Sequence, residues 1–250
     1  MGTAADLAMA LDPAAFSVAA GIVPHAWQAE VLRSTAPRIL LNCSRQSGKS
    51  STVATLACHT ALYSPGSLTL IVSPAERQSK ELFRKAMACY QALGRPVSPH
   101  AESALQLELE SGSRIIALPG KEGTIRGYSG AGLILIDEAS RVPDETYQAV
   151  KPMLAVSQGR LVALSTPFGT RGWWFEEWRG EETDWKRWQV RATECPHIPA
   201  EFLAQEKRKI GAWWWDQEYM TIFRDAQDAV FTQEVIDRMF AEDYEVWQLG

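Results

Sequence analysis

The stretch ILLNCSRQSGKSSTVATLACHTAL (residues 39–62) places an apolar strand, a short polar loop and a helix-forming run one after another. Part of the loop, Ser47-Gly48-Lys49-Ser50, matches the second half of the pattern G-x-x-x-x-G-K-[ST], in which backbone amides surround a phosphate. The first glycine of that pattern is Cys43 here. The start of the following helix adds unpaired N–H groups and the positive end of the helix dipole. We therefore expect a nucleotide phosphate to be held by Ser44, Arg45, Gln46, Ser47, Gly48, Lys49, Ser50 and Ser51.

The loop residues have different expected roles. Gly48 lets the backbone approach the phosphates, Lys49 reaches the β- and γ-phosphates, and the Ser50 hydroxyl ligates Mg²⁺. Arg45 is unusual, because a loop that wraps phosphate needs small residues. Either it brings a second positive charge to the γ-phosphate and the transition state, or it is a surface arginine in a nearby salt bridge.

The strand and helix alternation continues along the chain and favours an α/β fold with a mostly parallel sheet flanked by helices. Helices are expected over 75–93 and from Pro143. Ser111-Gly112-Ser113 separates two apolar runs and predicts an antiparallel hairpin inserted into the sheet. The runs that predict strands are LTLIVS (68–73), LQLEL (105–109), RIIAL (114–118), LILID (133–137) and RLVALST (160–166).

The pattern changes toward the C-terminus. From Trp173 onward the apolar content is mainly aromatic and the pattern mostly helical, with helices expected near 199–210 and 213–224. We place a subdomain boundary near residue 195. The domain interpretation is a core over 1–195 and a small, mostly helical subdomain over 196–250 that ends in an acidic segment.

Two carboxylates end the apolar strand 133–137. Asp137 and Glu138 follow four aliphatic residues, and in parallel α/β sheets ligands bind at this end of the strands. Asp137 would orient a Mg²⁺-bound water and Glu138 would polarise the attacking water, provided that this strand lies beside the phosphate loop. Ser165 and Thr166 end the next strand, where their hydroxyls either sense the γ-phosphate or cap the following turn.

Two further positions are candidates for nucleotide contacts. Arg126 lies in the glycine-rich segment GTIRGYSGAG, from which a guanidinium can reach a nucleotide at a subunit boundary, contact DNA, or do neither. Trp27-Gln28 precedes the phosphate loop by about fifteen residues. The glutamine amide can pair with adenine and so select ATP over GTP.

Length and charge restrict the function classes. The 250 residues are 46% hydrophobic and 22% charged, enough to bury one sizeable core. The net charge of −5, taken over the whole chain, argues against a polyanionic partner, but the charge is unevenly distributed. The last 25 residues hold six acids and Arg238, which leaves 24 basic and 24 acidic residues over 1–225. A neutral body can carry a basic patch, so nucleic acid is not excluded.

The cysteines and the apolar runs restrict the compartment. Four dispersed cysteines without a CxxC pair are typical of reduced thiols in a cytosol-like compartment. Cys195 and His197 are close in sequence, but we do not expect a metal site there. No apolar run approaches the roughly 20 residues that a membrane helix needs, so no membrane partner is expected.

The motifs and their order resemble the ATPase portion of the large terminase subunit of tailed phages, the motor that packages DNA into procapsids. The resemblance covers about residues 22–235. It rests on WQ (27–28), SRQSGKS (44–50), SPAERQSKELF (73–83), IRGYS (125–129), LILIDEAS (133–140), STPFGTRGWWFEEW (165–178) and DQEYMTIF (216–223).

This resemblance implies a RecA-like P-loop ATPase fold of the additional-strand type with a small lid subdomain. It also implies Mg²⁺-dependent ATP hydrolysis by a homomeric ring, pentameric on the capsid, that surrounds double-stranded DNA. The implied partners are the portal protein and the small terminase subunit, and the implied location is the host cytoplasm and, transiently, the procapsid vertex. Large terminases normally add a nuclease domain, for which 250 residues leave no room, so DNA cleavage is not expected of this chain.

The resemblance also assigns roles to matching residues. Lys49, Ser50, Arg45, Asp137 and Glu138 take the nucleotide roles given above, Ser165-Thr166 becomes the coupling motif, and Arg126 becomes an arginine finger acting in trans.

Contacts to DNA are the least constrained assignment. Arg77, Lys80 and Arg84 recur on one predicted helix face with Lys85 beside them. This stripe either binds phosphates or is a solvated helix face. The run Trp213-Trp214-Trp215 favours packing over a platform for stacked bases.

Two other functions remain as alternatives. A superfamily-2 helicase shares the WQ, phosphate-loop and DEAS features, but it needs a second RecA-like domain, and about 110 residues after Glu138 are too few. A nucleotide-switched assembly module with negligible turnover is the non-enzymatic alternative. Glu138 distinguishes it, because a pure switch needs no base to activate water.

Overall fold

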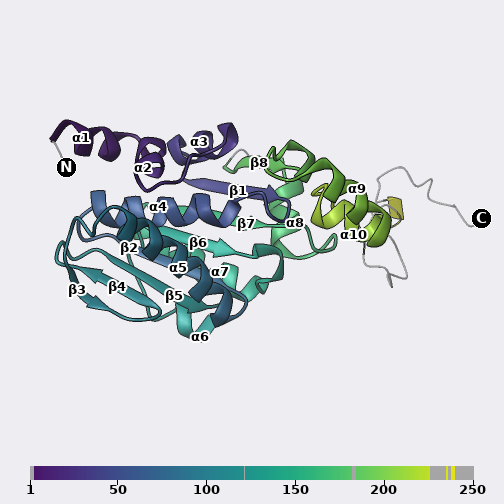
Figure 1. The fold of residues 1–250 in the computed structure, drawn as a ribbon. Coiled ribbons are helices and arrows are strands. Elements are labelled where there is room, and N and C mark those ends of the chain that lie inside the picture. Colours follow the sequence, from purple (N-terminus) through teal and green to yellow (C-terminus); the bar gives the residue numbers. More distant parts are fainter. Residues whose placement is uncertain (1–2, 121, 182–183, 226–234, 236–237, 240–250) are drawn as a thin grey trace, which may run out of the picture.

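A computed structural model of the chain describes residues 3–120, 122–181, 184–225, 235, 238 and 239. Its centre is an eight-stranded sheet in the order β3-β4-β5-β2-β6-β7-β1-β8 (Figure 1). The strands are β1 (Arg38–Cys43), β2 (Leu68–Ser73), β3 (Pro99–Glu102), β4 (Gln106–Leu109), β5 (Arg114–Pro119), β6 (Leu133–Asp137), β7 (Arg160–Ser165) and β8 (Lys186–Val190).

The sheet has a parallel part and an antiparallel extension. The six strands from β5 to β8 in the sheet order are mutually parallel, whereas β4 runs antiparallel to both β5 and β3. The expected hairpin is therefore confirmed, with β3 added outside it. The central strands read as continuous apolar runs because helices cover both of their faces.

Helices form a layer on each side of the sheet, and each layer closes its own hydrophobic core. One layer contains α4, which packs on α5, α3 and α2, while α7 and α8 pack together on the other side. The helices outside the C-terminal pair are α1 (Thr3–Leu11), α2 (Pro13–Ala19), α3 (Ala26–Arg33), α4 (Lys49–Tyr63), α5 (Glu76–Ala92), α6 (Glu122–Ile125), α7 (Asp144–Ser157) and α8 (Gly172–Arg179), with single 3₁₀ turns η1 (Ala139–Arg141) and η2 (Ala192–Glu194).

The C-terminal pair of helices differs in part from the expectation. Helix α9 spans Ala200–Lys209, as predicted, but α10 spans Gly211–Glu218 and ends well before residue 224. Leu203 and Trp215 belong to the same hydrophobic core as the sheet face covered by α4. The division into a core over 1–195 and a lid over 196–250 stays a prediction. The acidic segment after residue 225 lies almost entirely outside the described residues.

The expectation of mostly helical structure after Trp173 is wrong at one place. Strand β8 pairs in parallel with β1, with Cys43 opposite Val190, and extends the sheet beyond the phosphate-loop strand. In β8 only Val190 is buried, because the strand lies at the edge. Such a strand lacks the apolar run by which the central strands are found. Among the described helices, none has the length and apolar content that a membrane crossing requires.

Candidate nucleotide-binding site

The loop between β1 and α4 turns sharply at Gly48 into the start of the helix. Gly48 precedes α4 with a φ of +90°, a left-handed conformation that favours glycine. A Cβ atom at this position would lie 2.7 Å from the Gln28 amide nitrogen, so a larger residue would displace the Gln28 side chain. The Ser47 hydroxyl donates to the Ser44 carbonyl at 2.9 Å, which closes the loop.

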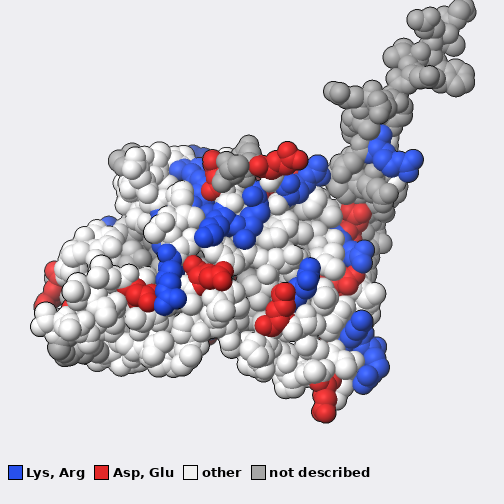
Figure 2. All heavy atoms as spheres, turned by 90° about the horizontal axis from the view of Figure 1, so that it is seen from above, with Lys and Arg blue, Asp and Glu red and all other residues white. Residues whose placement is uncertain are grey.

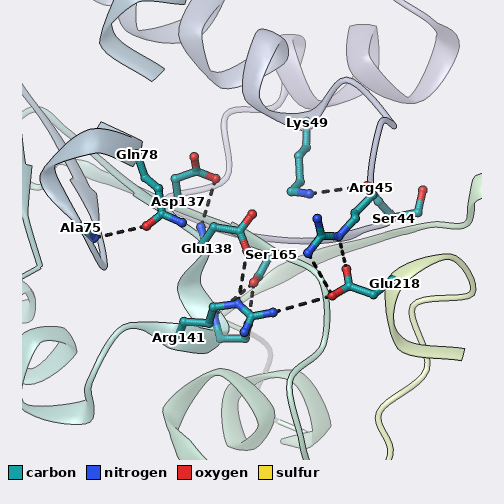
Figure 3. A network of polar contacts seen from close by, with 11 residues as sticks. Ser44, Arg45, Lys49, Ala75, Gln78, Asp137, Glu138, Arg141, Ser165 and Glu218 are labelled. Carbon is teal, nitrogen blue, oxygen red and sulfur yellow. Dashed lines mark hydrogen bonds and ion pairs between the residues drawn. The ribbon is translucent and has the colours of Figure 1, made fainter. Parts of the chain in front are cut away.

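Lys49 is the first residue of α4 and is buried, with 8% exposure. Its ammonium group donates to the Ser44 carbonyl oxygen at 3.5 Å, so it is folded over the loop instead of extending into solvent. Figure 3 shows Lys49 and Glu138 directed into the same space, which also faces the Arg45 guanidinium. Ser50 and Ser51 follow in the first turn of α4 and are partly buried.

The Gln28 amide holds the phosphate loop in this structure. Its nitrogen donates to the Gly48 carbonyl at 3.3 Å and to the Thr52 hydroxyl at 3.0 Å, while its oxygen accepts from the His25 backbone N–H at 2.7 Å. Trp27 packs, partly buried, against the core beside it. The proposed pairing of Gln28 with adenine stays a prediction, and these contacts give the residue a second role in fixing the loop.

A histidine pair that the sequence did not single out also contacts the loop. His197 accepts or donates at both ring nitrogens: Nδ1 lies 3.1 Å from His25 Nε2, and Nε2 lies 2.6 Å from the Gln46 carbonyl oxygen. Because a carbonyl only accepts, His197 Nε2 carries the proton in this contact. His197 therefore links the loop to α3 and to the segment that leads into α9. Within the described ranges, no group of three or more His, Cys, Asp or Glu side chains is arranged so that it could hold a metal ion.

Asp137 and Glu138 lie at the same edge of the sheet as the phosphate loop. Strand β6 is not the direct neighbour of β1, because β7 lies between them. This interposed strand is the additional strand that the resemblance implies. Asp137 is 8% exposed, and one of its carboxylate oxygens accepts from the Glu138 backbone N–H at 3.0 Å. Burial, with a smaller contribution from the charge of Glu138, raises the pKa of Asp137 to about 6, while Lys49 acts in the opposite direction.

The backbone at Glu138 is left-handed, with φ 50° and ψ 44°. A non-glycine residue in this region costs free energy, and such residues concentrate at functional sites. The conformation turns the chain sharply from β6 into η1. It places the Glu138 side chain, 27% exposed, 3.9 Å from the Arg141 guanidinium.

Ser165, one of the two predicted coupling residues, contacts the turn that follows Glu138. The Ser165 hydroxyl lies 2.7 Å from the Ser140 hydroxyl and accepts from the Ser140 backbone N–H at 3.2 Å. Ser165 and Thr166 are both buried, with exposures of 0% and 2%. The end of β7 is thus attached directly to the segment that carries the two acids.

Arg45 forms the salt bridge that was one of its two expected roles. Its guanidinium donates to both carboxylate oxygens of Glu218, at 2.6 and 3.2 Å. Glu218 also lies 3.7 Å from the guanidinium of Arg141, so three elements meet in one ionic network (Figure 3). Contact with a γ-phosphate stays a prediction for Arg45.

Arg126 follows α6, is exposed, and lines a cavity of about 590 Å³ with Tyr128 and with Asp144, Gln148 and other residues of α7. No phosphate-loop residue is among the described residues that line this cavity. The action of Arg126 in trans stays a prediction.

The proposed DNA stripe lies on the solvent side of α5. Arg77, Arg84 and Lys85 are exposed and Lys80 is partly exposed, but Arg84 pairs with Glu81 at 2.7 Å. Figure 2 shows basic and acidic side chains interspersed on the face above α1–α3, as a neutral body predicts. DNA contact by the stripe stays a prediction.

The tryptophan run is divided between packing and exposure. Trp215 is buried and stacks on Tyr219 with ring centroids 4.9 Å apart, whereas Trp214 is 43% exposed. The Trp213 indole donates to the Asp225 carbonyl at 2.7 Å. Trp215 therefore packs in the core, whereas the roles of Trp213 and Trp214 stay a prediction.

Comparison with known families decides where the chain belongs. The family model described as the N-terminal part of the T4likevirus-type terminase large subunit matches residues 40–238. The chain belongs to this family. The large terminase subunit of Thermus phage G20c is 31% identical over 185 residues, a match that covers 64% of this chain and 38% of the relative. The chain thus spans well under half the length of that relative.

Solved terminase structures share the fold. The ATPase domain of the large terminase of Thermus phage P74-26 superposes with a TM-score of 0.76 at 22% identity, over 84% of this chain and 97% of that one. The large terminase of the thermophilic bacteriophage D6E in complex with ADP gives 0.64 at 12% identity, over 78% and 52% of the chains. These likenesses confirm the α/β fold with a mostly parallel sheet flanked by helices.

Two network residues of this terminase chain were missed in the sequence. Arg141 follows Glu138 by three residues, and Glu218 lies in the quoted segment DQEYMTIF, but neither was given a role. The available signal was Arg45 itself, because a long cation within a tight loop requires a counter-charge. The sequence did not say which acid supplies it, since Arg45 and Glu218 are 173 positions apart.

Proposed function

We propose that the chain is an ATP-hydrolysing motor domain that moves double-stranded DNA during phage genome packaging. The observation that carries this proposal is that Lys49 and the pair Asp137-Glu138 lie at one edge of the sheet. Strand β7, which ends in the predicted coupling residue Ser165, lies between the strands that precede them. A site for phosphate alone needs the loop only. The additional acids suit a site where phosphate is transferred to water.

Each of the site residues has its own role in hydrolysis. The loop amides and Lys49 bind the phosphates and neutralise their charge. Glu138 accepts a proton from the water whose oxygen attacks the γ-phosphorus, as the bond to the leaving ADP oxygen breaks. Arg126 of a neighbouring subunit stabilises the charge that develops on the γ-phosphate.

Ser50 and Asp137 are the residues that would hold Mg²⁺. The donor set fits the ion, because hydroxyl and carboxylate oxygens are hard ligands and Mg²⁺ completes its shell with phosphates and waters. When bound, the ion neutralises negative charge on the β- and γ-phosphates. The raised pKa of the buried Asp137 carboxyl also fits, since a buried carboxylate is costly until a cation pairs with it.

The partners follow from family membership and are part of the same proposal. A homomeric ring, pentameric on the capsid, would surround the DNA duplex and contact the portal protein and the small terminase subunit. The site of action would be the procapsid vertex in the host cytoplasm. A ring needs few DNA contacts per subunit, so a chain without a basic excess remains suitable.

The substitution Glu138→Gln tests the catalytic assignment. ATP binding should persist while hydrolysis falls at least about 10²-fold, the range of a general base. Glu201→Gln is the matched control, because Glu201 is exposed on α9. Unchanged turnover in the Glu138 variant would reject the assignment, whereas negligible turnover in the wild type would favour the nucleotide-switched assembly module.

Duplex DNA tests the motor assignment separately. Steady-state hydrolysis should rise on addition of blunt double-stranded DNA of arbitrary sequence. A partial-duplex substrate should not be unwound at the same ATP concentration. Strand separation by the chain would favour the helicase alternative.

A further inference from the structure

Glu218 holds Arg45 by its side chain and by its backbone. Besides the two side-chain contacts at 2.6 and 3.2 Å, the Arg45 backbone N–H donates to the Glu218 carbonyl at 3.0 Å. The Glu218 side chain is 8% exposed, whereas that of Arg45 is 62% exposed. The carboxylate is therefore the fixed partner, and the arginine is the one with room to move.

A second guanidinium keeps Glu218 paired if Arg45 leaves. Arg141 lies 3.7 Å from a Glu218 oxygen and is also 4.1 Å from the centre of the Phe168 ring, which fixes its plane. A buried carboxylate that lost its only cation would be strongly destabilised. Because Arg141 remains, departure of Arg45 does not leave Glu218 as an isolated buried charge.

The end of α10 is attached to the edge of the sheet where phosphate would bind. The Asn42 amide donates to the Thr221 carbonyl at 3.0 Å, the Ala192 N–H to the Tyr219 carbonyl at 2.8 Å, and the Gly169 N–H to the Gln217 side-chain oxygen at 3.0 Å. These three donors lie at or after the ends of β1, β8 and β7. The position of α10 therefore depends on contacts made at the phosphate-loop edge.

A guanidinium forms one two-pronged pair at a time, with a carboxylate or with a phosphate. We propose that Glu218 competes with the γ-phosphate of a bound nucleoside triphosphate for Arg45, so that triphosphate binding and docking of the α10 end oppose each other. This inference rests on the proposed nucleotide binding. Linkage requires the opposition to be reciprocal: tighter docking weakens triphosphate affinity, and a bound triphosphate loosens the α10 end.

Titration calorimetry with ATPγS and ADP on four chains tests the proposal: wild type, Glu218→Gln, Arg45→Ala and the double variant. Glu218→Gln should bind ATPγS about fivefold more tightly, the factor for roughly 1 kcal/mol from a partly exposed ion pair. ADP affinity should not change, because ADP lacks the γ-phosphate. In the Arg45→Ala background the Glu218 substitution should have no effect. Asp216→Asn, which alters another α10 carboxylate paired with Arg224, is the matched control.

The outcomes separate this inference from the proposed function. If the wild type fails to bind ATPγS, both are wrong. If it binds ATPγS through Lys49, but Glu218→Gln leaves the affinity unchanged, weakens it, or shifts it equally without Arg45, only the competition is wrong.

Hydrogen exchange of the wild type gives a second test that needs no stable Glu218 variant. The amides of Tyr219 and Ile222, which donate to Trp215 and Asp216 carbonyls, should exchange faster when ATPγS is bound than when ADP is bound. In Arg45→Ala the nucleotide should make no difference at these amides. Equal exchange with both nucleotides in the wild type would overturn the proposal.

Discussion

Three charged residues at the phosphate-loop edge of the sheet are buried, whereas Arg126 and the α5 stripe are exposed. At the edge, Lys49, Asp137 and Glu218 are each at most 8% exposed and are held by contacts within the chain. Arg126 and the α5 stripe are exposed. Charges of the first kind are buried at the edge of the sheet, whereas those of the second kind lie at the surface, where another molecule can reach them.

Arg126→Ala should give the largest effect that this contrast predicts. An arginine finger contributes about 10³-fold or more to turnover, so hydrolysis by assembled chains should fall by that factor while ATP binding persists. Mixing Arg126→Ala with Glu138→Gln chains should restore part of the activity, because each supplies what the other lacks. Hydrolysis is measured against the mixing ratio.

The control for this experiment is Arg95→Ala, which removes an exposed arginine paired with Glu102 beside the antiparallel extension. It should leave turnover unchanged. If no mixing ratio restored activity, Arg126 would not act in trans, and its exposure would not indicate a role at a neighbouring subunit.

Substitution of Asp137, one of the buried charged residues, should have an effect of intermediate size on stability. Its folded-state pKa of about 6 lies above the ordinary 3.8, so the folded chain favours the protonated form. Without metal, this residue's contribution to stability is therefore greatest below about pH 4 and is lost as the pH rises through about 6. Asp137→Asn should be more stable than the wild type at pH 8 by roughly 2–3 kcal/mol in urea unfolding, and the difference should vanish toward pH 4.

The contribution of Asp12 to stability should change with pH in the opposite direction in the same urea-unfolding experiment. Its hydrogen bond with Arg33 lowers the pKa of the Asp12 carboxyl, so its stabilisation is present near neutral pH and is lost in acid. A gain in stability for Asp137→Asn that did not depend on pH would show that the gain does not come from the ionisation of Asp137.

The α5 stripe should give the smallest effect. Replacing Lys80 and Lys85 with Ala should weaken binding of duplex DNA uniformly across sequences and reduce the dependence of log affinity on log salt by about one to two. Fluorescence anisotropy over a salt series measures both. A slope equal to that of the wild type would assign the stripe to an ordinary solvated helix face.

The sequence predicted the parts of the molecule whose information is local. The β1–loop–α4 unit and the acids after β6 could be found because each consists of adjacent residues with a distinctive pattern. Edge strand β8 could not, since a single buried residue leaves no apolar run. The early end of α10 was missed because the residues that follow it, Tyr219 and Thr221, accept hydrogen bonds from Ala192 and Asn42, which are distant in sequence.

The same limit applies to the candidate site. Arg45 was recognised as unusual, but its pairing with Glu218 depends on the folded chain bringing α10 to the loop. The interposition of β7 was expected only from the resemblance, because the order of elements along the chain does not by itself reveal the order of strands in the sheet.

Strand β7 also acts as a spacer. Neighbouring strands lie about 4.8 Å apart, so one interposed strand separates the ends of β1 and β6 by about 10 Å. The strand thereby keeps Lys49, which begins α4 after β1, apart from Asp137 and Glu138 at the end of β6. The spacing of backbone hydrogen bonds therefore sets the separation between the phosphate loop and the two acids.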